Sequence, residues 1–333
     1  MILMKKIFAV LLALTLLFSL AACGAGNQEP GLYEVVLCLD WTPNTNHTGF
    51  YVADSLGYYE EEGFKIKIVQ PPEDGAEIMT ASGQAQFGIS FQDTLAAAFA
   101  LEEPIEVTAV AAVLQHNTSG IISRKGEGMD TPAGLENKRY STWNSPIELK
   151  MVEHLMKKDG ADHKKLQLVP SVTNEAEALR NGDVDAIWIY YGWAGIACEV
   201  SELDFDYFNM SDMEKTFDYY TPVIIGNNAF LEENPDLAKA FLRATEKGYR
   251  YAVENPEEAA QLLIKGDTTG SLIGSEELVT ESQKWIASQY IADSEKWGYM
   301  DAQRWNGFYQ WLYEEGLVDR DITDKGFSNN YLG

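Results

Sequence analysis

The sequence predicts an α/β protein of two lobes joined by a hinge. Extended apolar segments alternate with helical segments along the first half of the chain, as in parallel sheets with crossover helices. This alternation pauses near residues 116–132, resumes, and gives way to a helical C-terminal part. We expect 33–122 together with 224–333 to form lobe one and 123–223 to form lobe two, so that the chain crosses between the lobes twice.

The length of the chain bounds the number of domains, and its charge excludes one class of function. The chain has 333 residues, enough for one or two domains with substantial cores, and 46% of them are hydrophobic. Its formal net charge is -26, which disfavours binding to nucleic acid because phosphate backbones repel such a surface.

The first 22 residues are typical of a secretory signal peptide. Lys5 and Lys6 precede an apolar run that ends in small residues. The segment 20–23, LAAC, resembles a bacterial lipoprotein signal, which predicts that Cys23 is lipidated; a transmembrane anchor, or a cysteine that follows a signal peptide by chance, is the alternative. Removal of 1–22 takes away two lysines and no acidic residue, which changes the charge from -26 to -28.

We expect residues 23–32 to form the lipidated start and a flexible tether that holds a soluble domain at the outer face of the cell membrane. No other apolar run reaches about 18 residues, so no further span is predicted. The remaining cysteines, Cys38 and Cys198, are far apart in sequence and lack metal-type spacing, and whether they pair stays open.

The elements of the first unit follow from its periodicity. Strands are predicted where β-branched and aliphatic residues cluster, and helices where apolar residues recur every three or four positions. The predicted strands are 33–40, 64–71, 85–90 and 104–114, and the predicted helices are 49–63, 74–84 and 91–103.

The second unit and the C-terminal part are predicted in the same way. The strands expected are 135–143, 166–170 and 184–195, and the helices 145–160 and 175–182. Asn234-Pro235 and Asn255-Pro256 each pair a helix cap with a proline at the first helical position, which predicts two further helix starts.

Motifs for catalysis and for metals are missing. The sequence contains no P-loop, no GxGxxG after a strand, no GxSxG and no HExxH, and its four histidines lack ligand spacing. We therefore predict a protein that is not an enzyme and that holds neither a metal nor a cofactor.

Five loops at the carboxyl ends of predicted strands are rich in aromatic and amide side chains. Ligands of open α/β sheets bind outside these strand ends, so we expect the loops to line one cleft that suits a flat heteroaromatic ligand. The loops are 40–47, 90–93, 116–119, 142–145 and 190–193.

Each loop also has a purely structural interpretation. A tryptophan after a strand often packs in a core, and Gln92 or Asp93 could simply cap a helix. Tyr190 and Tyr191 point to opposite faces if the strand continues, so at most one of them is expected to face the cleft.

Several of these segments resemble a known family. The segment 39–53, LDWTPNTNHTGFYVA, the segment 83–98, GQAQFGISFQDTLAAA, and the YYGW motif at 190–193 resemble thiamine-pyrimidine-precursor binding proteins. These are substrate-binding lipoproteins of ABC importers, and they belong with pyrimidine-precursor synthases to the NMT1/THI5-like family. The resemblance extends over nearly all of the mature chain.

The resemblance implies a periplasmic-binding-protein fold of type II that closes over a formylaminopyrimidine or a related thiamine precursor. It implies that Trp41 and a tyrosine of the 190–191 pair enclose the ring. The other residues expected to contact the ligand are Asp40, Asn44, His47, Phe91, Gln92, Asn117, Trp143 and Trp193. The expected partners are a permease and an ATPase, and a monomer is expected.

Two departures keep alternatives open. The synthases carry a histidine where this chain has Asp93, together with a cysteine cluster that this chain lacks, which disfavours synthase activity. Many importer relatives carry an acidic residue where this chain has Ala194. A receptor of the same fold for riboflavin, an aromatic sulfonate or a nitrile derivative is therefore the other alternative.

Overall fold

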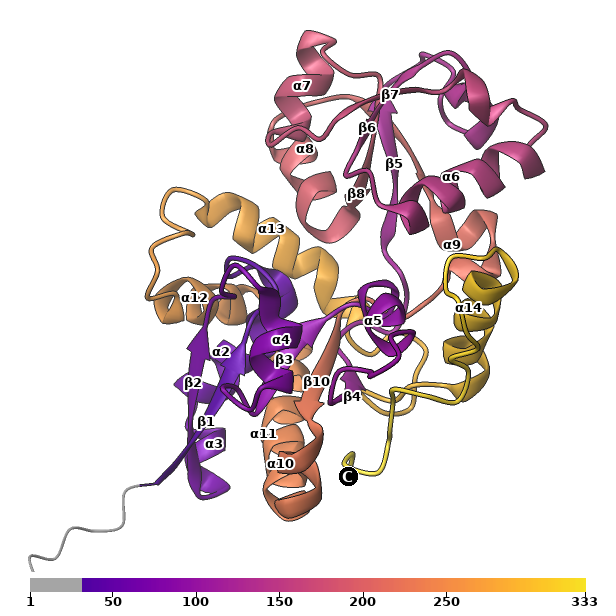
Figure 1. Cartoon of the computed structure of the whole chain (residues 1–333). Helices are drawn as coiled ribbons and strands as arrows, with labels where there is room; N and C mark the ends of the chain where they lie inside the picture. The colour runs from indigo at the N-terminus through magenta and orange to yellow at the C-terminus, as the bar shows by residue number, and fades with distance from the viewer. Residues whose placement is uncertain (1–31) are drawn as a thin grey trace, which may run out of the picture. The chain divides into compact units, whose positions relative to one another are not determined.

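The computed structural model describes residues 32–333, and the predicted signal peptide, Cys23 and most of the tether lie outside them. Two mixed five-stranded sheets organise the chain (Figure 1). The first sheet has the order β2-β1-β3-β10-β4 and the second β7-β6-β8-β5-β9. We call the first sheet with its helices the first lobe and the second sheet with its helices the second lobe.

The first sheet contains the four strands predicted for the first unit and one that was not predicted. Its strands are β1 (Tyr33–Cys38), β2 (Phe64–Val69), β3 (Phe87–Ser90), β4 (Val107–Ala112) and β10 (Val223–Asn227). β1 and β3 are parallel, whereas β10 lies antiparallel between β3 and β4. A segment more than 100 residues further along the chain therefore completes the centre of this sheet.

The second sheet likewise combines parallel and antiparallel strands. Its strands are β5 (Ser119–Arg124), β6 (Arg139–Thr142), β7 (Gln167–Pro170), β8 (Ala186–Tyr190) and β9 (Phe205–Asn209). β6 is parallel to both β7 and β8, and β5 pairs antiparallel with β8 and β9. β5 and β9 were not predicted, since β5 falls in the segment interpreted as a boundary.

Helices connect and cover both sheets. The first lobe carries α2 (Thr48–Ser55), α3 (Tyr58–Glu61), α4 (Gly75–Ala81), α5 (Gln92–Phe99), α10 (Asn228–Glu233), α11 (Pro235–Glu254), α12 (Pro256–Gly266) and α13 (Glu276–Ile286). The second carries α6 (Pro146–Lys158), α7 (Glu175–Asn181), α8 (Ile196–Val200) and α9 (Met210–Met213), and α14 (Ala302–Glu314) follows near the C-terminus. Pro235 and Pro256 begin helices, as predicted.

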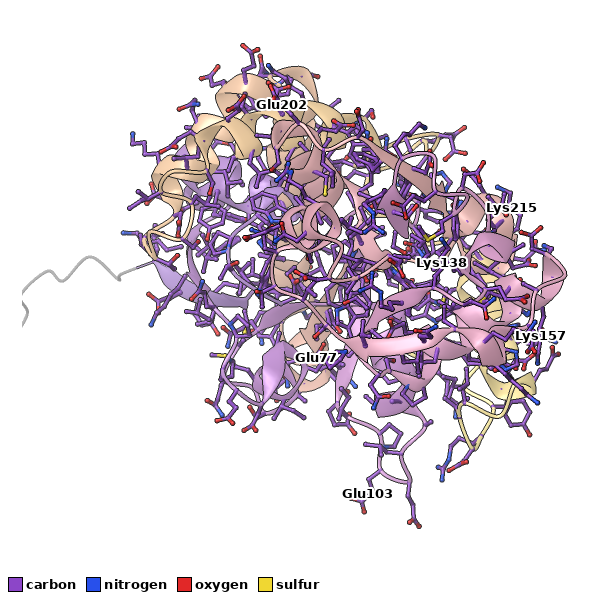
Figure 2. The ribbon with its side chains drawn as sticks, turned by 90° about the horizontal axis from the view of Figure 1, so that it is seen from above. Glu77, Glu103, Lys138, Lys157, Glu202 and Lys215 are labelled. Carbon is purple, nitrogen blue, oxygen red and sulfur yellow. The ribbon has the colours of Figure 1, made fainter. Side chains whose placement is uncertain are left out.

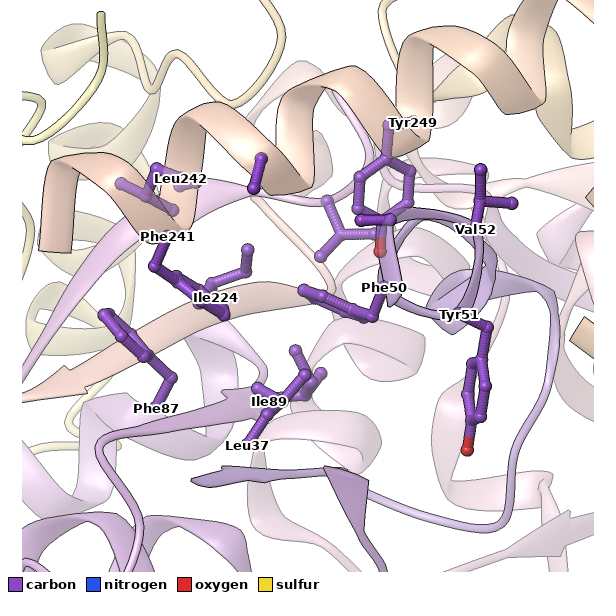
Figure 3. Close-up of a cluster of buried hydrophobic side chains, with 14 of the residues drawn as sticks. Leu37, Phe50, Tyr51, Val52, Phe87, Ile89, Ile224, Phe241, Leu242 and Tyr249 are labelled. Atoms are coloured by element: carbon purple, nitrogen blue, oxygen red, sulfur yellow. The ribbon is translucent and has the colours of Figure 1, made fainter. Parts of the chain in front are cut away.

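One face of the first sheet packs against α2 and α11. Phe50, Phe87 and Phe241 are fully buried there, and the rings of Phe87 and Phe241 stack at 3.9 Å (Figure 3). Two glycines allow the helices to approach closely. A methyl group on Gly248 would lie 2.0 Å from the carbonyl oxygen of Gly49, so no larger side chain fits without movement.

The second sheet buries both of its faces. Trp188 and Ile121 pack on the side of α6, whereas the neighbouring Ile187 and Ile122 pack on the side of α7 and α8. This alternation is the period of two that side chains follow along a strand. Cys198 belongs to this core, and Cys38 lies in a small apolar cluster with Ala76 and Ala85 in the first lobe. Both thiols are free, and burial raises the pKa of each to about 12.

The chain passes between the sheets twice, once between β4 and β5 and once between β9 and β10. Because β5 belongs to the second sheet from Ser119 onward, the first passage falls before residue 119, whereas the predicted division assigned 33–122 to lobe one. The C-terminal part also contacts the second lobe, since Trp311 of α14 packs edge-on against His154 and Phe217. Contacts join 34–333 into one unit.

Charged side chains cover the outside of this unit. Glu103, Lys157 and Glu202 project outward from the ribbon, and all three are exposed (Figure 2). Among residues 32–333, no helix combines the length and the apolar character needed to cross a membrane.

Candidate functional site

The loop after β1 is held by a buried histidine. The backbone N–H of Asn44 donates to Nδ1 of His47 at 3.2 Å, so Nδ1 is an acceptor and Nε2 carries the ring proton. Nε2 then donates to Oδ1 of Asp40 at 2.7 Å. These bonds fix the Asp40 carboxylate at the carboxyl end of the sheet, and the side chain of His47 is fully buried.

Residues of the C-terminal half support this loop from within the first lobe. The hydroxyl of Tyr249 donates to the carbonyl of Asn46 and that of Tyr290 to the carbonyl of Thr45, each at 2.6 Å. Both tyrosines are fully buried. The loop is therefore rigid on its inner side, whereas the neighbouring Trp41 is 56% exposed.

Two aromatic rings from different lobes meet at the ends of the sheets. Phe91 precedes α5 in the first lobe, Tyr190 ends β8 in the second, and their rings stack with centroids 6.2 Å apart and planes 18° apart. Burial, followed by the charges of Asp93 and Asp40, raises the pKa of Tyr190, whereas Thr221 opposes the rise. We call Asp40, Phe91, Asp93, Tyr190 and Thr221 the inter-lobe cluster.

Acidic groups predominate around this cluster. Burial raises the pKa of Asp93 to about 6, the backbone N–H groups of Asp93 and Thr94 oppose this rise, and the charge of Glu77 adds to it. Glu77 accepts a hydrogen bond from the hydroxyl of Ser90 at 2.5 Å. Burial is the main cause of the raised pKa of Cys38, and the charges of Glu77 and Asp40 add to it. The two carboxylates therefore lie near the same thiol.

Four other predicted contact residues bond to the protein itself. The side-chain N–H of Gln92 donates to the carbonyl of Trp305 at 2.8 Å, and its side-chain oxygen accepts from the N–H of Tyr220 at 2.9 Å. Asn117 is buried between the two crossings and donates to the carbonyl of Phe217 at 2.8 Å. Asn44 caps the short turn before α2, and His47 completes that turn.

The aromatic residues predicted for the second lobe separate into two groups. Trp143 is 52% exposed and packs against Trp188 at 5.9 Å. Tyr191 turns away from Tyr190; its ring lies 5.1 Å from Trp285, and its hydroxyl donates to Glu199 at 2.5 Å. Trp193 packs against the hydrophobic core of the first lobe, which ties the lobes together on this side.

An ionic cluster joins the two crossings. Both ring nitrogens of His116 face carboxylates. Nδ1 lies 2.8 Å from an oxygen of Asp218, and Nε2 lies 2.9 Å from an oxygen of Asp293. Asp218 also accepts from the N–H of Asn117 at 3.0 Å, and Arg304 donates to the carbonyl of Gln115. The hydrogen bond to Asp218, the charge of Asp218 and the hydrogen bond to Asp293 raise the pKa of His116. Burial and the charge of Arg304 lower it.

Three surface hollows of the described chain lie away from the inter-lobe cluster. They have volumes of about 520, 710 and 540 Å³ and are lined by residues of 199–205, 78–106 and 255–284, with acidic side chains in each. The predicted contact residues thus stay predictions. Sequence reasoning left Thr221 and Glu77 out, because nothing near them in the sequence marks them. It placed Asp93 in the cleft loop 90–93, with a helix cap as the alternative, and did not include Asp93 among the expected ligand contacts.

Comparison with known structures identifies the fold. The periplasmic aliphatic sulphonate binding protein of Escherichia coli superposes with a TM-score of 0.64 at 14% identity, over 87% of this chain and 94% of that one. The two mixed sheets with their helices are therefore the two-lobed α/β fold of periplasmic binding proteins.

Comparison of sequences identifies the family. A formylaminopyrimidine-binding protein of Halalkalibacterium halodurans is 29% identical over 96% of both chains. A 4-amino-5-hydroxymethyl-2-methylpyrimidine phosphate synthase of Legionella pneumophila is 27% identical over 70% of this chain and 73% of its own. The family model described as NMT1/THI5 like matches residues 44–259, and the chain belongs to this family.

Proposed function

We propose that this protein is the substrate-binding component of an ABC importer and captures a thiamine precursor of the formylaminopyrimidine type between its lobes. Similarity to a formylaminopyrimidine-binding protein along almost the whole chain supports the ligand class. The two-lobed fold supports the mechanism, because such lobes close over a ligand when the closed state binds it more tightly.

The observation that carries the proposal is the meeting of Phe91 and Tyr190 from opposite lobes, with their rings nearly parallel. Trp41 and Trp143 add two more aromatic surfaces, and each is more than half exposed. Large exposed aromatic surfaces close to directed polar groups are a common property of binding sites. A flat ring that stacks on them would bury this surface.

Charge favours a neutral or cationic ring over an anionic ligand. Asp40, Glu77 and Asp93 lie around the site. Burial and the charge of Glu77 both raise the pKa of Asp93, as expected where carboxylates gather. A sulfonate placed there would be repelled. The likeness to a sulphonate binding protein therefore extends to the fold, and we propose a different ligand chemistry.

The proposed receptor is anchored outside the cytoplasm through Cys23, and it delivers its ligand to a permease driven by an ATPase. This part of the proposal rests on the signal-like segment 1–23. Replacement of Cys23 with serine should move the protein from the membrane fraction to the soluble extracytoplasmic fraction. Unchanged membrane attachment of the variant would contradict lipidation at Cys23.

Synthase activity is the second candidate, because a synthase is among the relatives. Asp93 at the position of the synthase histidine, and the presence of only three cysteines, argue against it. Incubation of the purified protein with pyridoxal phosphate and iron should yield no pyrimidine product. Product formation would instead assign the chain to the enzymes of the family.

Titration of the purified protein with formylaminopyrimidine tests the proposal. We expect heat of binding and a change in tryptophan fluorescence, and we expect Trp41→Ala and Tyr190→Ala each to weaken binding about tenfold or more because stacking surface is lost. Tyr313→Ala is the control, since Tyr313 is 47% exposed on α14. No signal with formylaminopyrimidine or related pyrimidines would reject the proposed ligand class.

A further inference from the structure

Asp93 differs from its neighbours in having a buried oxygen without a partner. Its Oδ1 atom accepts no hydrogen bond within the part of the chain that the structure describes. The adjacent Gln92 has both amide atoms bonded, and Ser90 donates to Glu77. An unpaired buried carboxylate oxygen is costly, and a donor supplied from outside the chain would stabilise it.

The surroundings of Asp93 come from both lobes. Asp93 belongs to the first turn of α5 in the first lobe, and its charge raises the pKa of Tyr190 in the second lobe. Thr221, on the second crossing, is fully buried, and its hydroxyl lowers the pKa of Tyr190. The unpaired carboxylate oxygen of Asp93 thus accompanies the stacked pair of Phe91 and Tyr190.

The protonation state of Asp93 makes it an acceptor at neutral pH. Burial and the charge of Glu77 raise its pKa to about 6, against the effect of two backbone N–H groups. The carboxylate form therefore predominates at pH 7.5. A carboxylate only accepts hydrogen bonds, so the group that would satisfy it must carry an N–H or O–H donor.

We infer that Asp93 determines the specificity of the inter-lobe site: its carboxylate accepts a hydrogen bond from an exocyclic amino group on the ring of the ligand. This inference rests on the proposed function and adds the chemical group that the site recognises. An amino-substituted pyrimidine presents the donor that Asp93 lacks. The matching oxo compound presents a carbonyl oxygen at the same place, and two acceptors repel each other.

The position of Asp93 fits this role. The rings of Phe91 and Tyr190 would restrict a ligand to a plane, and Asp93 follows Phe91 by two residues, in the first turn of α5. An exocyclic group lies at the edge of such a ring, so a hydrogen bond from it to Asp93 would leave the faces free for stacking. A site built to pair with a donor discriminates strongly against an analogue that lacks it, because the buried acceptor is then left unpaired.

The test compares formylaminopyrimidine with its oxo analogue, in which the ring amino group is replaced by oxygen. We expect the wild-type protein to bind the amino compound at least about tenfold more tightly. In Asp93→Asn the side chain can donate to the oxo group, so the amino-to-oxo affinity ratio should fall at least about tenfold. Asp236→Asn is the matched control, because Asp236 is an exposed acid in the first turn of α11.

The outcomes distinguish this inference from the proposed function. If the wild-type protein binds neither compound, the pyrimidine assignment fails and the role of Asp93 fails with it. If the wild-type protein binds the amino compound but Asp93→Asn keeps the wild-type ratio, the role of Asp93 is wrong and the pyrimidine assignment stands. An equal loss of affinity for both compounds in Asp93→Asn would also overturn the inference, since it indicates a structural effect.

Discussion

Asp93 is a residue at which binding and stability are expected to conflict. Its pKa of about 6 in the folded chain lies above the ordinary aspartate value of 3.8, so the folded state binds more protons between these pH values. Stability therefore falls as the pH rises through this window. Asp93→Asn removes the ionisation and should raise the unfolding free energy at pH 7.5 by about 1–3 kcal/mol.

Urea unfolding at pH 7.5 and at pH 4 measures this effect. The gain from Asp93→Asn should be largest at pH 7.5 and nearly absent at pH 4, where the carboxyl group of the wild type is mostly protonated when folded. Asp236→Asn should have little effect at either pH. A loss of stability in Asp93→Asn at pH 7.5 would show that the carboxylate is well satisfied in the folded protein.

His47 is expected to matter for the geometry of the ligand loop. His47→Leu would leave the buried N–H of Asn44 and the carboxylate of Asp40 without their shared partner. The expected cost is about 2–4 kcal/mol of unfolding free energy, because each buried polar group loses a hydrogen bond. Urea denaturation measures it, and His163→Leu, whose nearest carboxylate is 3.8 Å away, should cost much less.

At the scale of elements, the contact between α2 and α11 allows no added volume. Gly248→Ala should destabilise the protein by about 1–3 kcal/mol, because the new methyl group meets the backbone of Gly49. Gly307→Ala is the control: Gly307 lies within α14 with open space around it, and alanine is the better helix former. Thermal unfolding should show a lower midpoint for the first variant and an equal or higher one for the second.

The elements also show where local patterns are informative. Strands β1 and β3 and helices α6 and α11 follow their apolar periodicity and their caps, so the sequence predicts them. β5, β9 and β10 are antiparallel strands of five or six residues that pair with strands distant in the chain. Nothing local distinguishes such a segment from a loop, since its pairing partners create the strand.

At the scale of the whole molecule, His116 connects the two crossings and the C-terminal part. Because both ring nitrogens face carboxylates, the protonated imidazole, which donates from both, is favoured over the neutral form. Asp218, first, and Asp293 raise its pKa above the ordinary value of 6.5, while Arg304 opposes them. The stabilisation is therefore complete below the ordinary value and is lost as the pH rises through the higher folded value.

Thermal unfolding between pH 5.5 and 9 tests this contribution of His116 to stability. The difference in midpoint between the wild type and His116→Gln should be about 2–4 °C at pH 5.5 and should shrink as the pH rises. His163→Gln should show no comparable change, because the carboxylate near His163 is that of Glu153, in the same lobe and 3.8 Å away. A difference that stays constant over this range would mean that His116 does not act through its charge.

The expected ligand contacts remain predictions, but the structure shows which of these residues lie together. Loops 40–47, 90–93 and 190–193 follow predicted strands, and the structure brings Asp40, Phe91 and Tyr190 together. Gln92, Asn117 and Tyr191 have the residue types of ligand contacts but bond within the protein. Residue type alone cannot tell these uses apart, because an amide or a phenol serves a hinge and a ligand equally well.

The sequence by itself determined the α/β class, the two units, most helices, and the family, since these depend on local periodicity, caps and motifs. Only the tertiary structure decided that β10 completes the first sheet and that Thr221 and Asp93 lie beside Tyr190. The physical reason is that burial and hydrogen bonding depend on neighbours in space. Whether an oxygen of an aspartate is buried and left without a partner is decided by the fold, and the sequence does not show it.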